Sequence, residues 1–131
     1  MPFTWRIKNN AIGGVTRSQP TLSVRFYREG SGAEPVRSWL KSLTAEERRE
    51  IRTDKKTVQS GWPLGMPVVD HVGGQIWEFR TRLATRLARV LFVLEGNEMI
   101  LLHGFIKKER TTPKPDLEPA RQRLKKSRST P

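Results

Sequence analysis

The stretch that decides the fold is QIWEFRTRLATRLARVLFVLEGNEMILLHGFIKK, residues 75–108. Apolar and polar residues alternate along it in three runs, and this pattern predicts strands over residues 75–83, 86–95 and 99–108. The dipeptide Gly96-Asn97 between the last two runs is typical of a short hairpin turn. Residues 75–108 therefore predict an antiparallel meander.

Alternation also assigns side chains to the two faces of this sheet, because successive residues of a strand point in opposite directions. In the first run, Arg80 and Arg82 share a face with Glu78, opposite Trp77 and Phe79. In the second run, Arg89 lies opposite an apolar set formed by Ala88, Val90, Phe92 and Leu94. We expect helices to cover the apolar face. That leaves Arg80 and Arg89 on an open face, where guanidinium groups can bind phosphate oxygens in bidentate fashion.

The length of the hairpin turn decides which residues of the third run share the face of Arg89. A two-residue turn pairs Glu95 with Glu98, whereas a three-residue turn pairs Glu95 with Met99. The first register brings Gly104, Ile106 and Lys108 to the arginines, and the second brings His103, Phe105 and Lys107. We favour the second because it leaves three apolar side chains for the core, those of Ile100, Leu102 and Ile106.

The chain before the meander predicts one strand and two helices. Residues 22–26 alternate as a strand, and Pro35 suits the first turn of a helix that ends near Leu43. Thr44 with Glu47 three residues on forms a capping-box pattern that begins a second helix or restarts the first, and Gly61 closes it. We interpret the polar surface of residues 45–56 as solvated, and residues 62–69 as a turn-rich connector.

After the meander, Pro113, Pro115 and Pro119 are expected to break regular structure until a short basic helix over residues 118–126. The predicted fold class is thus α+β, a twisted antiparallel sheet of about four strands with two helices on one face and a short C-terminal helix. We expect a basic, flexible extension at residues 1–22, a domain over residues 23–126 and a basic tail at residues 127–131.

The 131 residues carry a formal charge of +12, which is concentrated at the two ends. Residues 1–28 contribute +5, residues 29–106 contribute +1 and residues 107–131 contribute +6. This distribution points to a polyanionic partner, with a solvated surface as the alternative. The chain has no cysteine and two histidines, so neither a transition-metal site nor a cofactor is expected. The longest apolar run is five residues and the N-terminus lacks a signal-peptide pattern, so we expect a cytoplasmic protein without a membrane partner.

Several segments in order resemble the phage-derived HigB-like branch of the RelE/ParE toxin superfamily. They are FYREG, PVRSWLKSL, SGWPLGMPVV, IWEFR, ARVLFVLEG, ILLHGFIKKERTTP and EPARQR, and the resemblance as a whole spans about residues 24–125. The resemblance implies a RelE-like fold and the toxin of a type II toxin–antitoxin system. It implies an activity, metal-independent cleavage of translated mRNA in the ribosomal A site. The implied partners are the ribosome with its mRNA and a helix-turn-helix, HigA-like antitoxin, the toxin being monomeric or part of a hetero-oligomer with it.

The resemblance implies phosphate-binding roles for Arg80 and Arg89 and a place in the site for Lys107 and Lys108. RNA cleavage without metal needs a base, cations for the phosphorane and an acid. Lys107, His103 and Glu78 are candidate bases, and His103 or the second lysine is the candidate acid. RNA or ribosome contacts are predicted for Arg82, Arg86, Arg110, Arg121, Arg123, Lys125 and Lys126. A gyrase poison of the ParE type and a non-catalytic RNA- or ribosome-binding protein are the alternatives.

Overall fold

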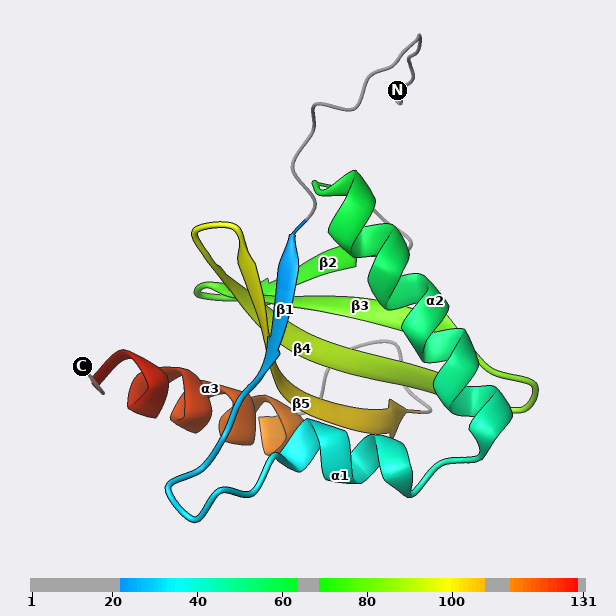
Figure 1. Cartoon of the computed structure of the whole chain (residues 1–131), viewed down its shortest axis with the longest axis horizontal. Helices are drawn as coiled ribbons and strands as arrows, with labels where there is room; N and C mark the ends of the chain where they lie inside the picture. The colour runs from blue at the N-terminus through cyan, green and yellow to red at the C-terminus, as the bar shows by residue number, and fades with distance from the viewer. Residues whose placement is uncertain (1–21, 64–68, 108–113, 130–131) are drawn as a thin grey trace, which may run out of the picture.

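The computed structural model describes residues 22–63, 69–107 and 114–129 (Figure 1). The elements are β1 (Ser23–Phe26), α1 (Pro35–Lys41), α2 (Ala45–Gly61), β2 (Val69–Gly73), β3 (Ile76–Arg82), β4 (Leu87–Glu95), β5 (Glu98–Lys107) and α3 (Lys114–Ser129). The strands form one sheet in the order β1-β5-β4-β3-β2. Among the described residues, no helix is both long and apolar enough to cross a bilayer.

The α+β fold is confirmed, with one strand more than the four predicted. The additional strand is β2, which lies within and after the predicted connector and pairs antiparallel with β3 across a turn at Gly74. The first strand, β1, pairs parallel with β5, whereas the other neighbours are antiparallel. Parallel pairing is available to β1 because the long α1–α2 connection separates it from the meander.

The predicted three-residue hairpin turn is wrong, although the facing residues are as predicted. Glu95 pairs with Glu98 across a two-residue turn in which Gly96 has φ +61°. Leu102 then has no ladder partner, because Phe92 pairs with Leu101 and Leu91 with His103. This bulge adds one residue to β5 and shifts its register. From there on, His103 and Phe105 lie opposite Leu91 and Arg89, on the predicted face.

Both faces of the sheet are covered, so the prediction of an open face is wrong. On one face α1 and α2 bury the predicted apolar residues of β4 together with Phe79. On the other face Leu117 and Ala120 of α3 pack against residues of β4 and β5, among them Leu91, Val93, Ile100, Leu102 and Phe105. Ile100 and Leu102 are therefore buried as predicted, but beneath α3. The register set by the two-residue turn and the bulge places both side chains on the α3 face.

The C-terminal helix α3 is longer than predicted, because Pro115 lies where a helix tolerates proline and Pro119 does not end the helix. Pro115 is the second helical residue, and the first turn needs no N–H donors within the helix. Pro119 lies inside the helix and lacks the N–H that would bond to the carbonyl of Pro115. Pro115 is exposed, so water can bond to that carbonyl. The helix continues to Ser129, into the predicted tail.

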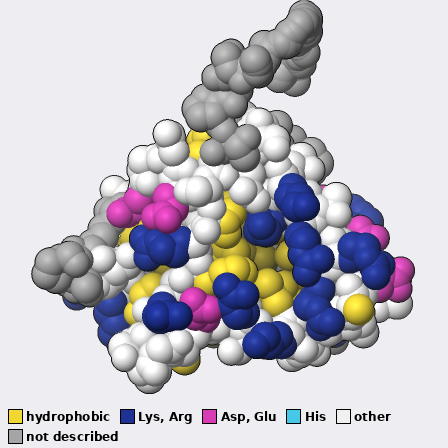
Figure 2. All heavy atoms as spheres, in the orientation of Figure 1, with side chains coloured by type: hydrophobic (Ala, Val, Ile, Leu, Met, Phe, Trp, Pro, Cys, Tyr) yellow, Lys and Arg dark blue, Asp and Glu magenta, His cyan; other side chains and the backbone are white. Residues whose placement is uncertain are grey.

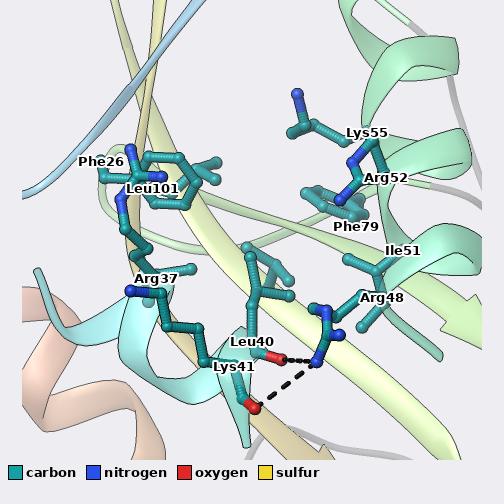
Figure 3. A pocket seen from close by; sticks show the side chains of 12 residues that line it. Phe26, Arg37, Leu40, Lys41, Arg48, Ile51, Arg52, Lys55, Phe79 and Leu101 are labelled. Carbon is teal, nitrogen blue, oxygen red and sulfur yellow. Dashed lines mark hydrogen bonds between the residues drawn. The ribbon is translucent and has the colours of Figure 1, made fainter. Parts of the chain in front are cut away.

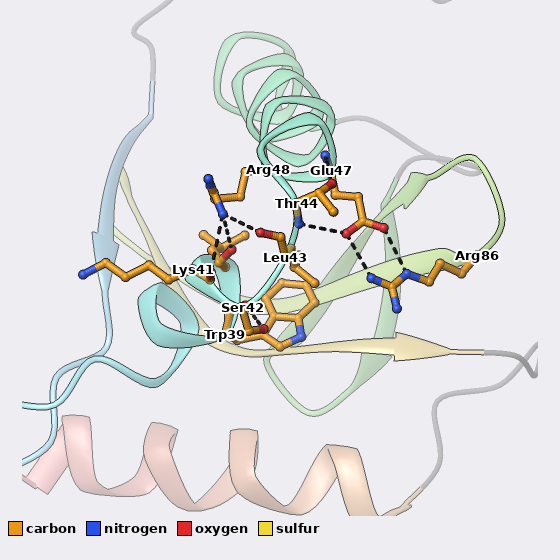
Figure 4. A network of polar contacts seen from close by, with 9 residues as sticks. Trp39, Lys41, Ser42, Leu43, Thr44, Glu47, Arg48 and Arg86 are labelled. Atoms are coloured by element: carbon orange, nitrogen blue, oxygen red, sulfur yellow. Dashed lines mark hydrogen bonds and ion pairs between the residues drawn. The ribbon is translucent and has the colours of Figure 1, made fainter.

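The capping box predicted at Thr44 is present and connects α2 to the sheet (Figure 4). The Thr44 hydroxyl accepts from the Glu47 backbone N–H at 3.1 Å, and the Glu47 carboxylate accepts from the Thr44 N–H at 3.1 Å. The same carboxylate accepts from Arg86 at 2.9 and 3.1 Å. Hydrogen bonds from Arg86, followed by that from Thr44, lower the pKa of Glu47.

Replacing the cap is expected to destabilise the domain measurably. Thr44→Ala removes the acceptor for the Glu47 N–H and should lower the free energy of unfolding by about 1 kcal/mol. Urea denaturation gives the value. Thr57→Ala is the matched control, because this exposed mid-helix hydroxyl only donates back to the Thr53 carbonyl. Equal effects of the two substitutions would contradict a capping role for Thr44.

Candidate active site

Arg80 and Arg89 face each other directly across β3 and β4. The carboxylate of Glu78 lies between them: its Oε2 is 2.8 Å from Arg89 NH1 and 3.8 Å from Arg80 Nε. Two like charges in register repel, and a buried carboxylate offsets that repulsion. Glu78 is therefore the group that allows two guanidinium groups to sit side by side on this face.

Burial separates the two arginines into different roles. The side chain of Arg89 is 4% exposed and that of Glu78 is fully buried, whereas the side chain of Arg80 is 17% exposed. Arg89 is thus an internal ion-pair partner of Glu78. Arg80 is the guanidinium group of the cluster that reaches the surface and can meet a phosphate.

His103 is held between the sheet and α3. Its Nε2 lies 3.1 Å from Asp116 Oδ1, and its Nδ1 lies 3.3 Å from Arg123 NH1. This pattern fits the neutral imidazole with its proton on Nε2, donating to Asp116 and accepting from Arg123. Arg123 NH1 also donates to the carbonyl of the bulge residue Leu102 at 2.7 Å. The bulge thus supplies an acceptor that attaches α3 to the sheet.

Burial lowers the pKa of His103 and outweighs the raising effect of Asp116, while the charge on Arg123 adds to the lowering. In the unfolded chain the same group keeps its ordinary value of 6.5. The unfolded state therefore takes up the proton first as the pH falls below this value, and the free energy of unfolding decreases. Above it both states are neutral and the effect vanishes.

We expect the wild-type protein to lose stability between about pH 7.5 and pH 5.5, and the His103→Gln variant to lose less over that interval. Urea denaturation of both proteins at each pH measures this. The variant keeps a hydrogen-bonding side chain, so its stability at the higher pH shows the cost of the substitution itself. An identical pH dependence in the two proteins would show that His103 is not held neutral by the fold.

The remaining predicted site residues are distributed over the molecule. Lys107 is the last residue of β5 and pairs with Leu87, while Lys108 and Arg110 lie outside the described residues. Arg82 is exposed at the end of β3, in register with Leu87. Arg86 pairs with Glu47 of α2. On α3, three predicted cations are exposed, Arg121, Lys125 and Lys126. Arg123 is instead the cation that contacts His103 and Leu102.

The sequence prediction missed the part that α3 plays in the site. The prolines predict a break in regular structure at Asp116, yet its carboxylate is the partner of His103. The apolar spacing of Leu117, Ala120 and Leu124 is the available signal, since these residues share one helix face. Read with Pro115 in the first turn, this spacing favours a helix from residue 114 onward.

Comparison with known proteins adds a family assignment. The family described as phage-derived protein Gp49-like (DUF891) matches residues 38–125, well over half of the chain. The matched segment begins in α1, contains every strand except β1, and ends within α3. No curated protein matches the chain.

Proposed function

We propose that this chain, which belongs to the phage-derived Gp49-like (DUF891) family within the RelE/HigB-like toxin group, is the toxin of a type II toxin–antitoxin system. Its proposed activity is ribosome-dependent, metal-independent cleavage of mRNA. The single observation that carries this proposal is the Arg80–Glu78–Arg89 cluster, with Arg80 at the surface and the other two groups buried behind it.

The cluster suits the charge that develops in RNA cleavage. Attack of a ribose 2′-oxygen on the neighbouring phosphorus forms a phosphorane with extra negative charge. Arg80 is positioned to stabilise this charge, and Arg89 adds positive potential from within the sheet. Because Glu78 is compensated by two cations, the cluster keeps a net charge of +1 towards the substrate.

We assign the proton transfers to Lys107, the last residue of β5, and to Lys108, which follows it in the sequence and lies outside the described residues. Lys107 accepts the proton of the 2′-hydroxyl as its oxygen bonds to phosphorus. Lys108 donates a proton to the departing 5′-oxygen as the phosphorus–oxygen bond breaks. The products are a 2′,3′-cyclic phosphate and a 5′-hydroxyl. His103 is the less suitable acid or base, since both ring nitrogens already have partners on α3.

The exposed cations of α3 support binding to ribosomal RNA. Neutralising them in Arg121→Gln/Lys125→Gln/Lys126→Gln is expected to weaken ribosome binding and to reduce the slope of log affinity against log salt by about 2, since each phosphate contact contributes about 0.7–0.9. Sedimentation of ribosomes with the protein at several salt concentrations measures it. Arg123 is left unchanged because it holds α3 to the sheet.

The control for this prediction is Arg49→Gln/Lys56→Gln. Both residues are exposed on α2, on the other face of the sheet. The control removes two charges and the α3 variant three, so an equal loss of slope per charge removed would show that binding depends on total charge rather than on α3.

Expression of the chain in bacteria separates the proposed function from other actions. We expect growth arrest with broken mRNA and halted protein synthesis, relieved by co-expression of an adjacent helix-turn-helix protein. Growth arrest with double-strand DNA breaks and intact mRNA would instead assign the chain to the gyrase poisons. Normal growth with ribosome-bound protein would leave it a non-catalytic binder.

A further inference from the structure

A groove lies on the face of the sheet opposite α3, between α1, β1 and α2 (Figure 2). Its volume is about 370 Å³, which falls within the range of about 300–1,000 Å³ typical of ligand sites. The floor is apolar and includes Phe79, Val90 and Leu101 of the sheet. Figure 2 shows a patch of hydrophobic side chains, in yellow, on this face, with dark blue Lys and Arg side chains around it.

The rim of the groove is strongly cationic (Figure 3). The described lining residues include five cations and no acidic residue: Arg37 and Lys41 from α1, and Arg48, Arg52 and Lys55 from α2. The surface of residues 45–56 was predicted to be merely solvated. The structure corrects this, because one side of α2 turns Arg48, Arg52 and Lys55 towards α1.

The rim charges are held close together, and one of them, Arg37, is compensated by an ion pair with Glu34. Arg48 donates to carbonyls at the end of α1, those of Leu40 and Lys41, which fixes the two helical walls relative to each other. Lys55 donates to Gln59 at 3.1 Å. Burial lowers the pKa of Lys55, and the nearby charges of Lys56 and Arg52 lower it further. Within the described part of the chain, Arg52 and Lys55 form no ion pair. A carboxylate bound between them would therefore relieve the repulsion between their positive charges.

The chemistry of the groove selects among candidate occupants. The chain's own first 21 residues carry three basic residues and no acidic one, so the rim repels them. A site for the unpaired bases of a single-stranded nucleic acid would offer exposed aromatic faces on which the bases stack. Here Phe79 is buried and the Phe26 ring is covered by the Arg37 guanidinium at 4.3 Å. An amphipathic helix with carboxylates beside its apolar face satisfies both the floor and the rim.

We propose that this groove binds an acidic, amphipathic helix of a partner protein, with the apolar side chains on the floor and the carboxylates against the rim. The proposal rests on the proposed function only for the identity of that partner, which would be the antitoxin. The groove and the Arg80 cluster lie on opposite faces of the sheet. Binding here therefore leaves the proposed catalytic face uncovered.

The test is fluorescence anisotropy with the full chain and a labelled synthetic helical peptide of leucine and glutamate, with leucine at positions i, i+3 and i+7. We expect saturable binding that weakens at least about tenfold when glutamine replaces glutamate, or when serine replaces leucine. Arg52→Glu/Lys55→Glu should weaken binding of the acidic peptide by a similar factor. Arg49→Glu/Lys56→Glu changes the net charge equally on the outer side of α2 and should weaken it by less than about threefold.

Three outcomes would overturn the proposal. One is no binding of the acidic peptide to the wild-type chain. Another is equal loss in the two double variants, which would indicate general charge attraction. The third is displacement of the peptide by a single-stranded RNA oligonucleotide whose own affinity depends on Arg52 and Lys55. Circular dichroism of each variant checks folding. Because no ribosome is present, failure here is distinct from failure of the nuclease assignment.

Discussion

Arg80→Ala is expected to slow cleavage of translated mRNA by about 100- to 1,000-fold, the loss typical when one donor to a developing oxyanion is removed. Arg80 is the partly exposed cation of its cluster, so the substitution removes the charge that reaches the surface of the proposed site. The protein should remain folded, because the buried pair of Glu78 with Arg89 is retained. Quantifying full-length and cleaved message in a reconstituted translation reaction gives the rate.

Two further variants make the Arg80 result specific. Arg80→Lys keeps the charge but loses the planar pair of donors, so it should recover only part of the rate. Arg49→Ala removes an exposed arginine from the opposite side of the molecule and should leave the rate unchanged within about threefold. Cleavage by Arg80→Ala at the wild-type rate would remove Arg80 from the chemistry.

Arg89→Met is expected to lower the free energy of unfolding by about 3–5 kcal/mol, because it leaves the fully buried Glu78 carboxylate without its 2.8 Å partner. Arg80 is 3.8 Å away and partly solvated, so it cannot compensate fully. Denaturant titration measures the loss. An inactive Arg89 variant is thus expected on grounds of stability alone, and its inactivity says nothing about catalysis.

The double variant Glu78→Gln/Arg89→Met tests whether the unpaired Glu78 carboxylate causes the loss of stability in Arg89→Met. Removing the charge of residue 78 removes the penalty of burying it unpaired, so the double variant should be more stable than Arg89→Met. If the loss of unfolding free energy in the double variant equals the sum of the losses in Glu78→Gln and Arg89→Met, Glu78 and Arg89 are not a coupled pair.

Local patterns predicted most of the elements and faces. The alternation of Ala88, Val90 and Phe92 correctly identified the face beneath α1 and α2. The Thr44–Glu47 spacing correctly identified the start of α2. These features depend on neighbours within a few residues, which a sequence displays directly.

Features set by distant contacts were not predictable in the same way. The bulge at Leu102 offsets the two-residue turn and restores His103 to the face of Arg89, so an incorrect turn led to a correct face. Its carbonyl is satisfied by Arg123, 21 residues along the chain. The cover provided by α3 changed the candidate site most, since it engages both nitrogens of His103.

Gly104 in the HGF sequence is required by the packing of Trp39, a contact that the sequence pattern does not reveal. A Cβ added at Gly104 would overlap the indole ring of Trp39, so the ring lies directly on the β5 backbone. This contact allows α1 to pack closely against the sheet, where it forms one wall of the cationic groove. The glycine of the HGF sequence therefore serves helix packing, whereas its neighbours His103 and Phe105 face α3.

The central claim is that this chain cleaves mRNA on the ribosome with Arg80 at the site of chemistry. The most direct measurement adds the purified protein to translating ribosomes and maps the ends of the message. We predict cleavage only of translated mRNA, with 2′,3′-cyclic phosphate and 5′-hydroxyl ends that are lost with Arg80→Ala. Intact message in the presence of ribosome-bound wild-type protein would contradict the claim.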